Sequence, residues 1–349
     1  MSDAGKFDKG WIGQSIGRRE DMRLLTGNGR YLADITLPGA LHLCFVRSQH
    51  GHARITRIDA AEALAMPGVV AVLTGEELCK EMQGQKIPVL IPAFPARYRQ
   101  YWPLAVDEVY WHGEPLAAVV AEDKYVAEDA AEAVVVEYET LPAVTDAEHA
   151  LSSDSEKVYA DWEDNEIFAM SYTGGFEAEE IAENDREVAG LFDGAPVILQ
   201  ERFRTHRCGV CPIETRGALA SWSDAEGLVV HLSTQRPHIE RLAIADLFEI
   251  PMADVQIIAP RDQGGGFGVK APFYREHLVV CHMTRKLKRP VRWIETREEH
   301  LMTVSQERDQ VHDLEIAARE DGKIIAIRNR GISDVGDGRM GVYWGFLLP

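Results

Sequence analysis

A glycine-dense stretch, Gln263-Gly264-Gly265-Gly266-Phe267-Gly268-Val269-Lys270, constrains the fold of this chain more than any other feature. An apolar run at 255–259 precedes it and is typical of a buried strand, and an apolar-periodic run at 274–287 follows it and is typical of a helix. Glycine allows backbone conformations and close approaches that other residues do not. Backbone N–H groups at a turn between a strand and a helix suit an anionic ligand such as a phosphate.

The glycine spacing excludes two well-known phosphate loops. A Walker A loop has glycine directly before its lysine, whereas Val269 stands before Lys270. A dinucleotide-binding fingerprint has the spacing G-x-G-x-x-G, which the glycines at 264, 266 and 268 do not match. Taken alone, the stretch therefore indicates only a turn, and its function depends on the rest of the chain.

The composition is that of a soluble globular protein. The chain has 349 residues, enough for two domains, of which 46% are hydrophobic and 27% charged. A formal net charge of −19 argues against nucleic acid and anionic membranes as partners, because both attract basic surfaces. We find no apolar run near the roughly 20 residues of a membrane span and no signal peptide. Five cysteines without a disulfide-framework spacing indicate a reducing cytoplasm.

Hydrophobic periodicity predicts mixed α and β structure in two parts, 25–145 and 196–349. Residues 1–24 are expected to form a polar arm and residues 146–195 an acidic linker. The apolar end at 345–349 suggests a truncation, or a subunit that completes its core against a partner, and the alternative is a C-terminal strand that packs into its own sheet. The expected strands are 41–47, 69–73, 115–121, 134–138, 197–203, 228–234 and 255–259, with helices capped by Thr74, Asp123 and Thr296, a helix at 237–248 and a hairpin turn at Asp321-Gly322.

Two pairs of residues resemble parts of metal or redox sites. Cys208 and Cys211 form a C-x-x-C, which occurs in redox dithiols and as half of a metal site. One such pair cannot complete a four-thiolate site, so a structural or incidental role is favoured. His50 and His52 would share a strand face and could bind a metal, but structural histidines are the simpler interpretation.

Three polar residues precede the glycine-dense stretch at places where ligands are often bound. Glu214 and Arg216 could form a buried ion pair beside a site, or an ion pair that is only structural. Gln235 ends a strand pattern, and the carboxyl ends of strands in α/β units line the usual ligand crevice. In isolation Gln235 is only a polar strand end.

Short segments over nearly the whole chain carry a stronger signal when they are taken in order. Together they resemble the molybdenum-binding large subunit of the molybdenum hydroxylases, a family that includes xanthine dehydrogenase, aldehyde oxidoreductase and aerobic carbon monoxide dehydrogenase. Each segment alone is a weak match. The segments are 17–21, 24–31, 45–55, 67–69, 73–75, 113–115, 127–131, 212–217, 233–238, 264–268 and 289–293.

The resemblance implies a fold and a set of cofactor contacts. Residues 25–145 are similar to the family's α/β hammerhead domain, and residues 196–349 to the first part of its molybdopterin-binding α/β domain. Gln235 matches the glutamine that hydrogen-bonds the molybdenum-bound oxo group or the pterin. Gly265, Gly266, Phe267 and Gly268 match the loop that lies against the molybdenum site, where glycines admit the cofactor and the aromatic ring excludes water and orients the substrate. No direct metal ligand is implied, because the pterin holds the molybdenum.

The implied activity is oxidation of an aldehyde, an N-heterocycle or carbon monoxide, with water as the oxygen source. The implied cofactor is molybdopterin, expected as the cytosine dinucleotide. Electrons would leave through [2Fe-2S] clusters on a small subunit to FAD on a medium subunit. The protein is therefore expected to be the molybdenum-binding component of a cytoplasmic hetero-oligomeric oxidoreductase.

The chain departs from the family in two respects. In xanthine dehydrogenases the position that matches Ala271 holds a glutamate that binds the purine. The small residue here resembles the carbon monoxide dehydrogenase side of the family instead. The family's large subunit is also much longer, and its later half carries the catalytic glutamate. We therefore expect no catalytic residue in this chain, which would be the N-terminal part of a split or truncated large subunit and inactive without a partner that carries the C-terminal half.

Two other functions remain open from the residues. The first is a non-catalytic assembly or scaffold subunit that keeps the fold without molybdenum, and the metal content of the native complex would discriminate it. The second is a thiol redox or zinc module on Cys208 and Cys211, which unchanged behaviour after replacement of both by serine would exclude.

Overall fold

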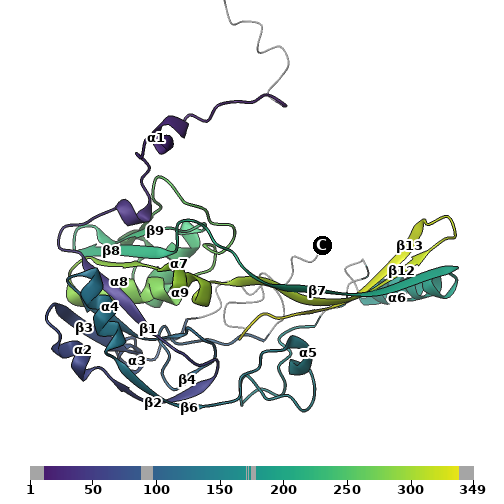
Figure 1. Cartoon of the computed structure of the whole chain (residues 1–349), viewed down its shortest axis with the longest axis horizontal. Helices are drawn as coiled ribbons and strands as arrows, with labels where there is room; N and C mark the ends of the chain where they lie inside the picture. The colour runs from purple at the N-terminus through teal and green to yellow at the C-terminus, as the bar shows by residue number, and fades with distance from the viewer. Residues whose placement is uncertain (1–11, 88–96, 170, 172, 174–177, 338–349) are drawn as a thin grey trace, which may run out of the picture.

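The computed structural model describes residues 12–87, 97–169, 171, 173 and 178–337. The molecule has a body built on a large mixed sheet and an arm of long strands (Figure 1). Mixed sheets packed with helices confirm the predicted α+β class. The start of the predicted polar arm and the apolar end at 345–349 lie outside the described residues.

The body is organised by a seven-stranded sheet with the strand order β10-β9-β8-β11-β1-β5-β3. β1 (Leu41–Arg47) pairs in parallel with β11 (Val291–Ile294), with Leu41 opposite Val291. Strands from the first and second halves of the chain therefore share one continuous sheet. Its other strands are β3 (Val69–Thr74), β5 (Pro115–Ala121), β8 (Gly217–Ser223), β9 (Gly227–Leu232) and β10 (Val255–Ile258).

Strand β5 separates two hydrophobic cores. All its residues are buried, as expected for an apolar run without alternation. Ala118 and Val120 face the first core, which includes Leu278 of helix α8 (Arg275–Leu287). Val119 faces the second core, with Ala130 of helix α4 (Lys124–Glu132).

A smaller sheet borders the second core, with the strand order β4-β2-β6. Ala53 of β2 (Ala53–Asp59) and Val109 of β4 (Glu108–Val109) are both buried in that core. β6 (Val135–Thr140) pairs antiparallel with β2. The remaining helical elements are α1 (Asp21–Leu25), η1 (Leu32–Asp34), α2 (Ala61–Ala65), α3 (Gly75–Glu81), α5 (Ala147–Ala150), α6 (Ala178–Asp193), α7 (Pro237–Leu247), η2 (Met252–Asp254) and α9 (Arg297–Thr303).

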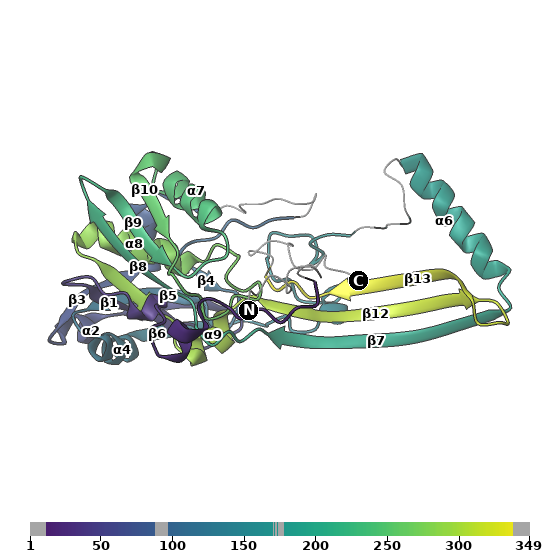
Figure 2. The same ribbon diagram turned by 90° about the horizontal axis from the view of Figure 1, so that it is seen from above.

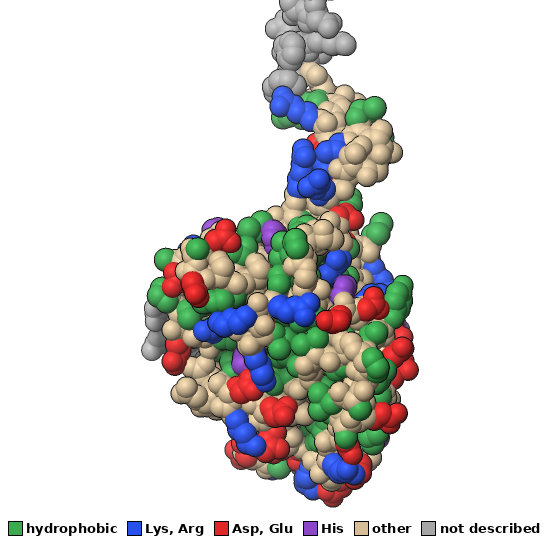
Figure 3. Space-filling view, turned by 90° about the vertical axis from the view of Figure 1, so that its left-hand side faces the viewer, with side chains coloured by type: hydrophobic (Ala, Val, Ile, Leu, Met, Phe, Trp, Pro, Cys, Tyr) green, Lys and Arg blue, Asp and Glu red, His purple; other side chains and the backbone are tan. Residues whose placement is uncertain are grey.

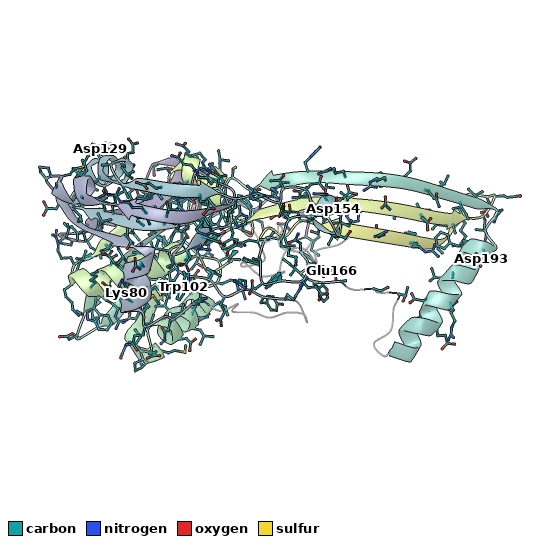
Figure 4. The ribbon with its side chains drawn as sticks, turned by 90° about the horizontal axis from the view of Figure 1, so that it is seen from below. Lys80, Trp102, Asp129, Asp154, Glu166 and Asp193 are labelled. Carbon is teal, nitrogen blue, oxygen red and sulfur yellow. The ribbon has the colours of Figure 1, made fainter. Side chains whose placement is uncertain are left out.

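The arm consists of β7 (Val197–Gly209), β12 (Gln306–Ala318) and β13 (Ile324–Ser333), in the order β13-β12-β7. Its strands leave the body together and extend well beyond it (Figure 2). The labelled residues in Figure 4 show the separation, because Asp193 at the end of α6 lies beside the far end of the arm, whereas Lys80 and Asp129 lie on the body.

The local signals in the sequence are confirmed where they depend on neighbouring residues. Thr74 and Thr296 begin α3 and α9, each with a capping box. The Asp123 side chain accepts hydrogen bonds from the N–H groups of Tyr125 and Val126 and so begins α4. The expected hairpin at 321–322 connects β12 to β13.

Other boundaries differ from the predictions. The strand expected at 228–234 ends at Leu232, because the Ser233 and Thr234 hydroxyls bond to groups outside the sheet. The strand expected at 197–203 continues to Gly209, because β12 pairs with it along its whole length. The acidic segment expected as a linker contains α5 and α6, so it is not wholly irregular.

The surface of the body carries both signs of charge. Figure 3 shows acidic and basic side chains interspersed on one face, with apolar side chains between them. No helix within the described ranges combines the length and the apolar character that a membrane crossing requires.

Candidate functional site

The structure brings Gln235 and the glycine-dense loop together. Gln235 follows β9, and its Oε1 accepts hydrogen bonds from the backbone N–H groups of Gly268 (3.0 Å) and Lys270 (3.3 Å). The Gln235 N–H donates to the Lys270 carbonyl at 2.8 Å. A Cβ at Gly266 would lie 2.8 Å from Gln235 Cδ, so glycine at 266 lets the amide lie against the loop.

These contacts fix the orientation of the Gln235 amide. Because Oε1 accepts two N–H groups, the amide NH2 must be on the opposite side, away from the loop. Gln235 is exposed, and Nε2 makes no hydrogen bond with any described residue. Two N–H donors are therefore available to an oxygen atom of a ligand.

The tip of the loop presents further donors. The N–H groups of Gly265, Gly266 and Phe267 make no hydrogen bond within the described part of the chain. The φ angles of Gly265 and Phe267 are +99° and +48°, whereas that of Gly266 is not positive. Consecutive backbone N–H groups at a turn can form an anion-binding concavity. The Phe267 side chain at the tip is 68% exposed.

The carboxylate of Glu214 lies beneath the loop. Its Oε2 accepts hydrogen bonds from the Gly264 N–H (3.0 Å), Ser233 Oγ (2.9 Å) and Lys270 Nζ (2.8 Å). Its Oε1 accepts the N–H of Leu32 at 3.1 Å. Burial alone would raise the pKa of Glu214, but the hydrogen bonds from Lys270 and the Gly264 N–H lower it overall. Burial lowers the pKa of Lys270 despite the hydrogen bond to Glu214.

Glu214 and Arg216 do not pair with each other, so the ion pair suggested by the sequence is wrong. Arg216 instead pairs with Glu295, and both side chains are fully buried. Arg216 Nε donates to Glu295 Oε1 at 2.9 Å, and its guanidinium carbon lies 3.9 Å from the centroid of the Tyr274 ring. The Tyr274 hydroxyl donates to the Val269 carbonyl at 2.7 Å, so this cluster supports the end of the loop.

Sequence reasoning did not assign Lys270 or Glu295 to the site. Lys270 lies inside the glycine-dense stretch, and its burial has no local signal because lysine is normally exposed. Glu295 directly follows β11, but its pairing with Arg216 depends on strands β11 and β8 being neighbours in the sheet.

Replacement of two loop glycines by alanine is expected to lower the free energy of unfolding by different amounts. In Gly264→Ala the new Cβ would overlap Glu214 Cβ and lie 3.0 Å from the Glu214 backbone N, so it should lower the free energy of unfolding by about 1–3 kcal/mol. In Gly266→Ala the three atoms nearest the new Cβ all belong to the Gln235 side chain, so the amide should move away, and the loss of stability should be limited to its two hydrogen bonds with the loop. Chemical denaturation of both variants tests this difference, and equal losses of stability would contradict it.

The other candidate pairs are not gathered into a metal site. Among the described residues, no group of three or more His, Cys, Asp or Glu side chains could hold a metal ion. Cys208 and Cys211 are both exposed free cysteines. His50 and His52 lie in a turn between β1 and β2 rather than on a strand, which corrects the expected shared strand face. His52 is held structurally, because its Nδ1 lies 2.7 Å from the Pro142 carbonyl oxygen.

Two family models match the chain. The aldehyde oxidase and xanthine dehydrogenase a/b hammerhead domain matches residues 26–142. The molybdopterin cofactor-binding domain matches residues 174–340, which include Gln235, Glu214 and the glycine-dense loop.

Curated relatives and solved structures agree with these matches. The carbon monoxide dehydrogenase large chain of Hydrogenophaga pseudoflava is 37% identical over 327 residues, covering 91% of this chain and 39% of the relative. The crystal structure of quinoline 2-oxidoreductase from Pseudomonas putida 86 superposes with a TM-score of 0.81 at 36% identity, covering 93% of this chain and 39% of that chain. The Cu,Mo-CO dehydrogenase structure superposes with a TM-score of 0.79 at 34% identity, covering 91% of this chain and 40% of that chain. The chain thus spans about two fifths of the length of these relatives.

Proposed function

We propose that this chain, which belongs to the molybdenum hydroxylase family, forms one wall of a molybdopterin site in an oxidoreductase. The expected substrate is an aldehyde, an N-heterocycle or carbon monoxide, with water as the oxygen source. One observation carries the proposal: the loop fixes the Gln235 amide so that its NH2 group faces away from the loop, and the N–H groups at 265–267 make no hydrogen bond within the described part of the chain.

The residues fit the cofactor. Oxygen-rich groups need hydrogen-bond donors, and the outward Gln235 NH2 and the loop N–H groups supply them without a charged side chain. Gly266 lets the Gln235 amide lie against the loop, since a Cβ there would occupy the space of the Gln235 side chain. The cofactor would supply the redox chemistry, while Gln235 and the loop bind and orient it and Phe267 excludes water. Ala271, which is buried, leaves no carboxylate for a purine substrate.

We also assign parts of the chain to domains. Residues 25–145 would form the hammerhead domain, residues 196–349 the first part of the molybdopterin-binding domain, and the acidic segment 146–195 a linker between them. The proposed dinucleotide is the cytosine form. Electron transfer would require a partner with [2Fe-2S] clusters and a partner with FAD, and the catalytic glutamate would come from a polypeptide that supplies the C-terminal half.

An exposed apolar face on the arm supports the need for such a polypeptide. Leu199 is paired with Ile316, and Ile316 with Ile327, so their side chains lie on one face. Phe203, four residues after Leu199 on the same strand, shares that face. Leu199, Phe203 and Ile327 are 57%, 51% and 56% exposed. The opposite face carries Arg328, which lies against Phe192 of α6. An uncovered apolar face of this kind is typical of a surface that a partner buries.

The native complex provides the test. The protein should be purified with its partners under non-denaturing conditions, and its molybdenum, iron, flavin and acid-released nucleotide measured per chain. We expect molybdenum and a cytosine nucleotide in stoichiometric amounts, together with iron and flavin. A complete complex without molybdenum would contradict the proposal and favour a scaffold role.

A further inference from the structure

We propose that the Glu214 carboxylate, paired with the buried Lys270, is a positioning residue that holds Gln235 and the glycine-dense loop in register before any ligand binds. Its importance for molybdopterin binding rests on the proposed function, whereas the positioning itself does not. Nothing in the sequence pattern alone assigns this role to Glu214.

The contacts of the carboxylate connect separate segments. Gly264 and the buried Lys270 flank the loop tip, and both donate to Glu214 Oε2, at 3.0 and 2.8 Å. Ser233, two residues before Gln235, donates to the same oxygen at 2.9 Å. A single oxygen atom therefore fixes both ends of the loop relative to the strand end that carries Gln235.

The second oxygen of the carboxylate fixes the body of the protein to this junction. Oε1 accepts the N–H of Leu32, which is buried at the start of η1. The Glu214 N–H also donates to the Gly264 carbonyl at 3.1 Å. The loop backbone is thus bound to Glu214 through both its N–H and its carbonyl group.

Lys270 keeps the carboxylate in place. Its side chain is 0% exposed, and Glu214 is the acceptor of its ammonium group among the described residues. Moving a buried ammonium away from its carboxylate would leave an uncompensated charge, which is strongly unfavourable. The packing is also tight, because a Cβ at Gly264 would overlap Glu214 Cβ. The pair can therefore adopt few other arrangements.

The donors at 265–267 depend on this arrangement. They lie between the two anchored ends of the loop, and they make no hydrogen bond of their own within the described chain. Their direction is then set by Gly264 and Lys270. Loss of the carboxylate should release the loop tip and the Gln235 amide together, since Gln235 Oε1 accepts from Gly268 and Lys270 in the same loop.

Two variants separate positioning from stability. Lys270→Met removes the anchor at one end of the loop but leaves the carboxylate with its three other donors, so the loop should loosen only in part. The double variant Glu214→Met/Lys270→Met removes the carboxylate without leaving a buried charge, and methionine fills a similar volume to either side chain. The exposed pair Glu76 and Lys80, with Nζ and Oε1 2.6 Å apart, offers a matched control as Glu76→Met/Lys80→Met.

The readout is hydrogen–deuterium exchange of the peptide 259–274 in the purified protein with its native partners. We expect exchange in the double variant to be about tenfold to a hundredfold faster than in the wild type, because hydrogen bonds to a charged acceptor are lost. Exchange in the control should stay within about threefold of the wild type, below the effect of one such bond. Exchange in Lys270→Met should lie between the control and the double variant, because only one of the two loop anchors is lost. The unfolding temperature of the double variant should change little, so the faster exchange should be confined to the loop.

Unchanged loop exchange in the double variant would overturn the proposal, as would a uniform increase across the whole protein. If the double variant does not fold, Glu214→Gln provides the same test. An amide has one acceptor oxygen instead of two, so it must turn its NH2 group toward either the Leu32 N–H or the loop donors. Faster exchange at the Leu32 segment or in the loop then supports the proposal, and exchange equal to the wild type at both places overturns it.

A second readout separates this inference from the proposed function. The molybdenum content and the electron paramagnetic resonance signal of reduced molybdenum should be measured on the same preparations. A shifted signal or a lost cofactor in the double variant, with retention in the control, supports a positioning role at the cofactor. A wild-type complex without molybdenum but with faster loop exchange in the double variant would refute the proposed function and leave the positioning role intact.

Discussion

Replacement of Arg216 by methionine is expected to lower the free energy of unfolding by about 3–5 kcal/mol, as is usual when one partner of a buried ion pair is removed. Both Arg216 and Glu295 are 0% exposed in their side chains. Without Arg216, the Glu295 carboxylate would keep only neutral donors such as the Thr303 hydroxyl, and a ring nitrogen of His300 at 2.8 Å. The cation would also be lost from the Tyr274 ring, 3.9 Å away.

Chemical denaturation at neutral pH measures this loss. Arg57→Met is a suitable control, because the Arg57 side chain is 58% exposed and its ion pair with Glu137 is on the surface. An exposed pair of this kind contributes about 0–1 kcal/mol. A change below about 1 kcal/mol for Arg216→Met would show that the buried pair contributes no more to the free energy of unfolding than a surface pair does.

The effect of Arg216→Met should also depend on pH. Burial alone would raise the pKa of Glu295, but Arg216 and the hydrogen bonds to the carboxylate hold it far below the ordinary value of 4.5. A group with a lowered pKa in the folded state stabilises the protein above its unfolded pKa, and this stabilisation is lost as the pH falls. The stabilisation that Glu295 gives the wild type should therefore be full above pH 4.5 and decrease below it, and the destabilisation caused by Arg216→Met should be smaller at low pH.

The elements that the sequence predicted well are those with short-range causes. The capping boxes at Thr74 and Thr296 involve residues three positions apart, and β5 is an uninterrupted apolar run. These features need no knowledge of what lies next to them in space. The long arm is different, because β7 is almost wholly exposed and its length is set by pairing with β12.

The candidate site could be predicted only in part for the same reason. The resemblance to a family identified Gln235 and the loop, and the structure places them in contact. The ion pairs were not predictable, because Glu214 lies two residues from Arg216 in sequence but beneath a different segment. Its partner Lys270 is 56 positions away, and the partner of Arg216 is Glu295, 79 positions away. Such pairs depend on which strands are neighbours in the sheet.

Replacement of Gln235 by glutamate is expected to reduce molybdopterin retention or catalytic activity by about 10–100-fold, the usual loss when a residue that supports a metal site is changed. A carboxylate keeps an acceptor for the N–H groups of Gly268 and Lys270, so the loop should remain in place. It has no N–H donor, however, and would present a negative oxygen where the wild type presents the NH2 group.

The comparison with Gln235→Leu identifies which side of the amide matters. Leucine removes both the acceptor and the donors, so the loop should loosen as well as lose the contact to the ligand. If the proposed role of the NH2 group is correct, both variants lose cofactor. Only Gln235→Leu then increases hydrogen exchange in residues 264–270. Gln256→Leu, at an exposed position whose amide donates to the Glu226 carbonyl at 3.4 Å, is the control and should retain the cofactor. Full retention in Gln235→Glu would mean that the outward face of this amide does not contact the cofactor, because a donor and a negatively charged acceptor cannot bind the same oxygen equally well.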